Sequence, residues 1–112
     1  MDNSELLQKW QVEYKKGYAK PILLMLLSEG KNYPYQLTKQ IFERTKGQIA
    51  IASSNIYPVI SSLVKEGLVV EEKSDESRRI IYSATDKGIS FLKELKESIK
   101  EFIDLIDQLI AP

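Results

Sequence analysis

The side chains available for chemistry are hydroxyls, amides, carboxylates, ammonium groups and guanidinium groups, because the 112 residues include no His and no Cys. Without His, the chain lacks the commonest general base and the commonest metal ligand. Ser-His and Cys-His nucleophilic pairs are excluded within one chain. Glu71, Glu72, Asp75 and Glu76 lie on or beside a predicted exposed hairpin, where carboxylates stay solvated. The composition therefore predicts no enzyme, no metal site and no cofactor, which leaves binding.

Residues 53–67 carry the pattern that best suits binding. Ser53, Ser54 and Asn55 are good N-cap residues, and Gly67 is a good helix stop, so a helix is predicted between them. At 3.6 residues per turn, the apolar side chains share one face. The opposite face is small, polar and hydrogen-bonding, and comprises Ser54, Asn55, Pro58, Ser61, Ser62 and Lys65. Such a face lets a helix backbone approach base edges in the major groove of DNA.

Two arginines lie in the segment that follows this helix. Residues 68–73 and 79–84 are rich in Val, Ile and Tyr, and the polar residues 74–78 separate them, which predicts a β-hairpin. Arg78 and Arg79 either discourage edge-to-edge aggregation or contact phosphates. Asp75 and Glu76 make the hairpin tip acidic, so the tip should repel phosphates.

The remaining segments are predicted to form helices, which must position the polar helix face and the arginines of the hairpin. The first is predicted over residues 5–17 with Ser4 as its N-cap, and it places Leu7, Trp10 and Tyr14 on one face. A second, buried helix is predicted from about residue 19 to Gly30, and a third over residues 35–46. Tyr33, Tyr35 and Lys39 are expected near the start of the third helix, where main-chain N–H groups favour phosphate.

The last predicted helix begins after Thr85 and repeats apolar residues at alternating three- and four-residue steps. This spacing is the heptad seam of a coiled coil. Its members are Leu92, Leu95, Ile99, Phe102, Ile106 and Leu109, and Ile103 and Ile110 widen it. So much apolar surface needs a partner, and a second copy related by two-fold symmetry is the simplest one.

The length fits one domain, with residues 1–17 as an N-terminal helix, 18–84 as a central unit and 85–112 as a dimerisation helix. The longest apolar run, residues 22–27, is far short of the roughly 20 residues of a membrane helix, so a cytoplasmic location is expected by default. The order of elements predicts a mostly α fold with a small β-hairpin wing: a winged helix-turn-helix domain with N-terminal and long C-terminal dimerisation helices.

The charges sum to zero, with sixteen Lys plus Arg against sixteen Asp plus Glu. A nucleic-acid binder usually shows a basic excess. Here residues 1–84 hold a slight basic excess and the last helix an acidic one, so a shallow dependence of DNA affinity on salt is expected. Zero net charge and an acidic wing favour an alternative, a protein-interaction module pairing through its C-terminal coiled-coil helix. The small polar face of residues 53–65 favours DNA.

Three segments carry a resemblance to a known family: YPYQLTKQI at residues 33–41, NIYPVISSLVKEGLV at 55–69 and RRIIYSATDKG at 78–88. Together they resemble the PadR family of winged-helix transcription regulators, small-subfamily type. The resemblance implies a homodimer that binds a palindromic operator in double-stranded DNA, usually as a repressor, with a small-molecule effector releasing some members. Many members have Gly where this chain has Ser54, and Gly-Gly before the wing arginines. In some drug-sensing relatives a Trp occupies the position of Ile99.

The predicted sites follow from these patterns together with the resemblance. The predicted DNA-binding residues are Tyr33, Tyr35, Lys39, Ser53, Ser54, Asn55, Tyr57, Pro58, Ser61, Ser62, Lys65, Lys73, Arg78 and Arg79. Tyr57 is expected to pack its ring and present its hydroxyl to phosphate. The predicted dimer interface is Leu7, Trp10, Tyr14, Leu92, Leu95, Ile99, Phe102, Ile103, Ile106 and Leu109. Trp10, Tyr14 and Ile99 are the candidate ligand residues, although ordinary packing is the commoner role of such an aromatic stripe.

Overall fold

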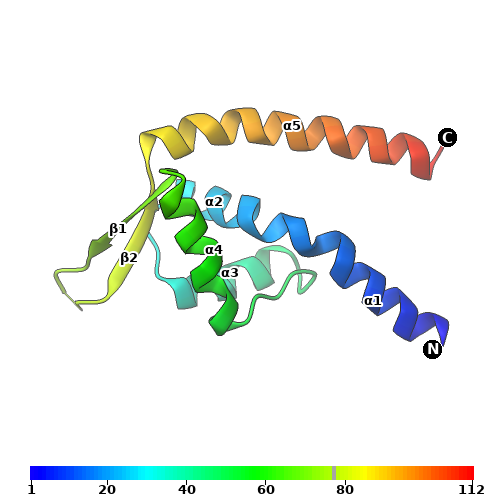
Figure 1. Cartoon of the computed structure of the whole chain (residues 1–112), viewed down its shortest axis with the longest axis horizontal. Coiled ribbons are helices and arrows are strands. Elements are labelled where there is room, and N and C mark those ends of the chain that lie inside the picture. Colours follow the sequence, from blue (N-terminus) through cyan, green and yellow to red (C-terminus); the bar gives the residue numbers. More distant parts are fainter. Residues whose placement is uncertain (77) are drawn as a thin grey trace.

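Helices at both ends of the chain flank a three-helix unit and a β-hairpin in the computed structural model, which describes residues 1–76 and 78–112 (Figure 1). The elements are α1 (Asn3–Lys15), a 3-10 turn η1 (Lys16–Tyr18), α2 (Ala19–Glu29), α3 (Pro34–Arg44), α4 (Ser53–Lys65), β1 (Val69–Lys73), β2 (Ile80–Ala84) and α5 (Asp86–Ile110). This arrangement confirms the predicted fold class, a mostly helical winged helix-turn-helix.

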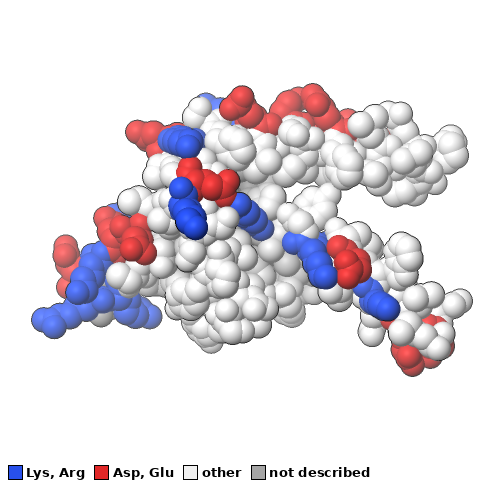
Figure 2. Space-filling model, viewed as in Figure 1, with Lys and Arg blue, Asp and Glu red and all other residues white. Residues whose placement is uncertain are grey.

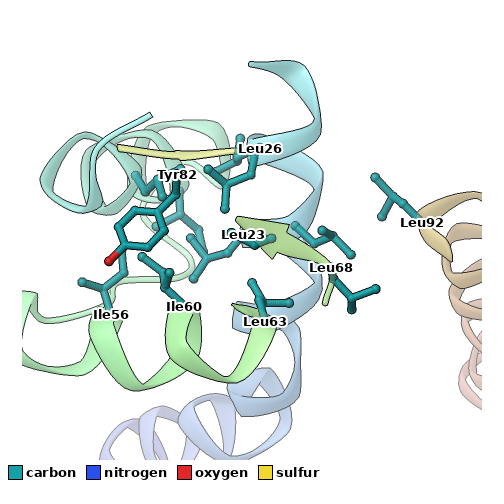
Figure 3. Close-up of a cluster of buried hydrophobic side chains, with 13 residues drawn as sticks. Leu23, Leu26, Ile56, Ile60, Leu63, Leu68, Tyr82 and Leu92 are labelled. Carbon is teal, nitrogen blue, oxygen red and sulfur yellow. The ribbon is translucent and has the colours of Figure 1, made fainter. Parts of the chain in front are cut away.

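The hydrophobic core lies where α2, α3 and α4 meet the base of the hairpin (Figure 3). α2 is buried on most sides, as its nearly continuous apolar sequence predicts, and α3 and α4 each contribute one apolar face. The largest fully buried side chains are Leu23, Leu24, Leu27, Leu37, Ile41, Ile56, Ile60 and Leu63. Burying each such side chain contributes about 1.5–3 kcal/mol, so this cluster fixes the positions of α2, α3 and α4 relative to one another.

The first two helices join without the predicted stop. Asp2, not Ser4, is the N-cap of α1, because its carboxylate accepts a hydrogen bond from the Glu5 N–H at 2.8 Å. The prediction of Ser4 as N-cap was therefore wrong. Gly17 lies inside η1, and the chain continues through this tight turn directly into α2.

The starts of α3 and α4 also differ from prediction. α3 begins at Pro34, whose fixed φ suits a first helical position, and it ends at Arg44 rather than at residue 46, since Lys46 adopts a φ of 54°. The N-cap of α4 is Ala52, which offers no side-chain hydrogen bond. Ser53 and its two successors are thus first-turn residues, and the predicted capping by serine is wrong.

The hairpin and α5 share one anchoring point at residues 67–88. β1 and β2 pair antiparallel with Val69 opposite Ala84 and Lys73 opposite Ile80. The Thr85 hydroxyl accepts a hydrogen bond from the Gly88 N–H at 3.0 Å and donates one to the Gly67 carbonyl at 2.7 Å. The predicted cap of the last helix is confirmed.

α5 leaves the core soon after this anchor. Leu92 is 2% exposed and packs in the core of its own protomer, so its assignment to the dimer seam is corrected: it offers no surface to a partner. Leu95 is half-buried against the same core. Beyond these residues α5 extends away from the body on the same side as α1, and both termini lie there (Figure 1). No helix of the described residues is long and apolar enough to span a membrane.

Candidate nucleic-acid interface

The outer face of α4 is open to solvent and rich in hydrogen-bonding groups. Ser53, Ser54, Asn55 and Ser61 are exposed, and their side chains make no hydrogen bond to any residue that the structure describes. Because Ala52 is the N-cap, the hydroxyls of Ser53 and Ser54 do not cap the helix. The hydrogen-bond donors and acceptors of these side chains are therefore available to the edges of DNA bases.

Two residues of this face depart from what the sequence predicts. Ser62 is half-buried, and its hydroxyl donates to the Glu66 carboxylate at 3.2 Å, so it is less available than Ser61. The Tyr57 side chain is 54% exposed, so its ring is more open than the predicted packed ring. Pro58 lies in the second turn of α4 and has no N–H to donate to the Ser54 carbonyl, which adds an acceptor to the exposed end of the helix.

The hairpin lies beside the predicted residues of α4 and forms a groove with them. Pro58, Ser61, Ser62 and Lys65 of α4, together with Glu71 and Tyr82 of the hairpin, line an open groove of about 600 Å³. Burial, followed by the negative charge of Glu71, raises the pKa of Tyr82, so its phenol stays protonated. Neither Glu71 nor Tyr82 was predicted as a site residue; the pairing of β1 with β2 places them opposite each other.

The hairpin loop presents its charges to solvent. Arg78 and Arg79 are exposed, as are Lys73, Asp75 and Glu76, and Figure 2 shows both signs of charge over the hairpin. Ser77, part of the predicted acidic tip, lies outside the described residues. Arg78 adopts a left-handed backbone with a φ of 57°, which is unusual for a residue with a Cβ. Backbone strain of this kind concentrates at functional positions.

A third group lies at the start of α3, next to the hairpin. The Arg79 guanidinium stacks over the ring of Tyr33, with 4.3 Å from Cζ to the ring centroid. The Lys39 ammonium lies 5.2 Å from the ring centroid of Tyr35, which is exposed. The wing and the first turn of α3 are therefore neighbours, as a surface that follows a DNA backbone requires.

The residues predicted for a dimer interface are mostly solvent-exposed along α1 and the C-terminal part of α5. Exposed members are Leu7, Trp10, Tyr14, Phe102, Ile103, Ile106 and Leu109, while Ile99 is half-buried. Trp10 and Phe102 are 65% and 56% exposed. In Figure 2 the end of α5 is largely uncharged, the visible face of α1 carries charges of both signs, and open space separates the two helix ends. Apolar side chains this exposed are typical of an interaction surface.

The candidate ligand residues are not gathered around a pocket in the described chain. An open pocket of about 770 Å³ touches α1, but Gln8, Gln11, Val12, Lys15 and the loop before α4 line it. Trp10 and Tyr14 do not line this pocket, and both are exposed.

Comparison with known proteins identifies the protein family of this chain. Residues 23–103 match the sequence profile of the transcriptional regulator PadR-like family, which spans α2 to most of α5. The chain belongs to the PadR-like family. The family consists of transcriptional regulators, which implies regulation through DNA binding.

Relatives of known structure share this architecture. A transcriptional regulator from Clostridium thermocellum is 28% identical, with a TM-score of 0.80 over 88% of this chain and 96% of that chain. A PadR-like transcriptional regulator from Bacillus cereus is 25% identical, with a TM-score of 0.78 over 89% of this chain and 98% of that one. A PadR family regulator from Eggerthella lenta, 24% identical, shares the fold with a TM-score of 0.84 over 96% and 95% of the two chains.

Two curated relatives differ in length. A Lysinibacillus sphaericus protein described as "Uncharacterized protein X" is 30% identical over 96 residues, which cover 80% of this PadR-like chain and 88% of the relative. The transcriptional regulator YqjI of Escherichia coli is 25% identical over 84 residues, which cover 75% of this chain but only 40% of that protein.

Proposed function

We propose that this PadR-like chain is a homodimeric repressor that binds a palindromic operator in double-stranded DNA. The observation that carries the proposal is the outer face of α4, whose Ser53, Ser54, Asn55 and Ser61 side chains are exposed and make no hydrogen bond to described residues. α4 enters the major groove with these groups toward the base edges, while the wing contacts the phosphates.

Homodimer formation is the second part of the proposal. The apolar faces of α1 and α5 pack against the same faces of a second copy, and two-fold symmetry presents two α4 helices to the two halves of the operator. Release by a small, flat ligand at Trp10, Tyr14 and Ile99 is the third part. The exposure of the two aromatic rings on α1 supports it, because stacking on such rings suits a planar molecule.

Asn55→Ala is expected to relax the preference for one base in each half-site by about 1–3 kcal/mol, because a carboxamide reads a base edge with paired hydrogen bonds. Competition binding with operators substituted one position at a time measures this loss. Gln108→Ala, which truncates an exposed carboxamide near the end of α5, is the matched control and should leave every preference unchanged. Equal base preferences in the Asn55→Ala variant and the unaltered protein would show that Asn55 does not contact the bases.

Arg78→Gly and Arg78→Ala are expected to separate the stability of the wing from its DNA contact. Both remove a phosphate contact from each protomer of the dimer, so both should weaken binding to all sequences alike and reduce the slope of log K against log salt concentration by about 1.8. Only Gly relieves the left-handed backbone at this position, so Arg78→Gly should be more stable than Arg78→Ala by about 1 kcal/mol. Urea unfolding and salt-dependent binding measure the two effects, and unchanged DNA affinity in both variants would contradict the assignment.

A further inference from the structure

The stack between the wing and α3 joins two residues that are distant in sequence. The Arg79 Cζ lies 4.3 Å from the centroid of the Tyr33 ring, well inside the range of a cation–π contact. Tyr33 is half-buried at the N-cap of α3, whereas Arg79 is exposed beside the start of β2. A partly buried ring therefore lies beneath a solvent-facing cation.

The ring of Tyr33 is held by its backbone surroundings. Asn32 and Tyr82 exchange two backbone hydrogen bonds of 2.9 Å, which ties the segment before α3 to β2. The Tyr33 N–H donates to the Asn32 side-chain oxygen at 2.9 Å, and Pro34 is buried directly after it. An ion pair between Lys31 and Glu72 adds a link to β1. The ring is thus a fixed platform at the base of the wing.

We infer that Tyr33 is a positioning residue for Arg79, holding the guanidinium ready for the DNA backbone. A long arginine side chain loses rotamer freedom when it contacts a phosphate, and a side chain already ordered loses less. The inference rests on the proposed DNA-binding function and gives Tyr33, predicted near a helix start whose main-chain N–H groups favour phosphate, a role through its ring on Arg79.

Arg78 provides an internal comparison. It neighbours Arg79 and is also exposed, but among the described residues it stacks on no ring. Loss of the Tyr33 ring should therefore change the behaviour of Arg79 and leave Arg78 unaffected. Phe can stack as Tyr does, so Tyr33→Phe should preserve the effect and Tyr33→Leu should abolish it.

The first arm of the experiment uses the protein without DNA. NMR relaxation of the arginine Nε–H groups reports how ordered each guanidinium is on the picosecond-to-nanosecond timescale. We expect Arg79 to be ordered in the unaltered protein and in Tyr33→Phe, and mobile in Tyr33→Leu, with Arg78 mobile in all three. An Arg79 that is equally mobile in the unaltered protein and in Tyr33→Leu would overturn the inference.

The second arm measures operator affinity in two double-mutant cycles. Tyr33→Leu should weaken binding about two- to fivefold in the unaltered background and have no further effect when Arg79 is already Ala. In the Arg78→Ala background, Tyr33→Leu should keep its full effect. The salt slope should fall with Arg79→Ala but not with Tyr33→Leu, which leaves the charge in place.

The outcomes separate this inference from the function on which it rests. Additive effects of Tyr33→Leu and Arg79→Ala, or equal losses in Tyr33→Phe and Tyr33→Leu, would overturn the positioning role while operator binding stands. An unaltered protein that binds no DNA sequence preferentially would overturn the proposed function, and the role of the stack with it. Urea unfolding of each variant identifies any loss caused by partial unfolding, and Tyr33→Phe tests the hydroxyl without disturbing the fold.

Discussion

Gly88→Ala is expected to lower the free energy of unfolding by about 3 kcal/mol, a large share of the stability of so small a domain. A Cβ at Gly88 would lie 2.1 Å from the Leu68 carbonyl oxygen and 3.0 Å from its carbonyl carbon. Both atoms belong to the backbone, and the same carbonyl accepts a 3.0 Å hydrogen bond from the Thr85 N–H. The first turn of α5 must therefore move away from Leu68, the residue before β1, or break that bond.

Urea unfolding at a fixed protein concentration measures the loss. Gly17→Ala is the matched control, because nothing lies within 4 Å of a Cβ at Gly17, and it should leave stability nearly unchanged or slightly improved. Equal stabilities of Gly88→Ala and Gly17→Ala would mean that α5 is not docked on the Leu68 backbone through this close contact.

Phe102→Asp is expected to turn the proposed dimer into a monomer. Phe102 is 56% exposed on the apolar face of α5 that is proposed to pack against a second copy. Burying a phenylalanine contributes about 1.5–3 kcal/mol, and two-fold symmetry applies the substitution twice, so the dissociation constant of the dimer should rise at least a hundredfold. Operator affinity should fall with it, because a monomer reads only one half-site.

Sedimentation at several protein concentrations measures the dimer equilibrium. Lys100→Asp is the control, because it introduces the same carboxylate on the side of α5 opposite Phe102. A Phe102→Asp variant that stays as dimeric as Lys100→Asp would show that this face of α5 is not the interface. An unaltered protein that is monomeric at all concentrations would contradict the homodimer itself.

The spacing of apolar residues, together with the capping and turn residues, was enough to predict most of the fold. The 3.6-residue repeat in residues 53–67 separates Ile56, Ile60 and Leu63, which are buried, from the exposed polar face. The Val- and Ile-rich segments predicted the hairpin, and Thr85 predicted the start of α5. These signals act within a few residues, so they can be read without knowing the tertiary structure.

Features that depend on distant parts of the chain could not be read in the same way. A heptad pattern does not distinguish contact with the protein's own core from contact with a partner, which is why Leu92 was assigned to the dimer seam. The choice between neighbouring N-cap candidates, such as Asp2 and Ser4, depends on how the chain enters the helix. The stack of Arg79 on Tyr33 joins two elements, and no local pattern indicates it.

The proposed DNA contacts and dimer remain predictions, and selecting bound sequences from random double-stranded DNA with the purified protein tests them together. A homodimer with one α4 in each half-site should enrich a two-fold symmetric sequence whose half-site centres lie about one helical turn apart, roughly 34 Å. Selected DNA without symmetry, or no enrichment over the starting pool, would contradict the account and would favour pairing with another protein through α5.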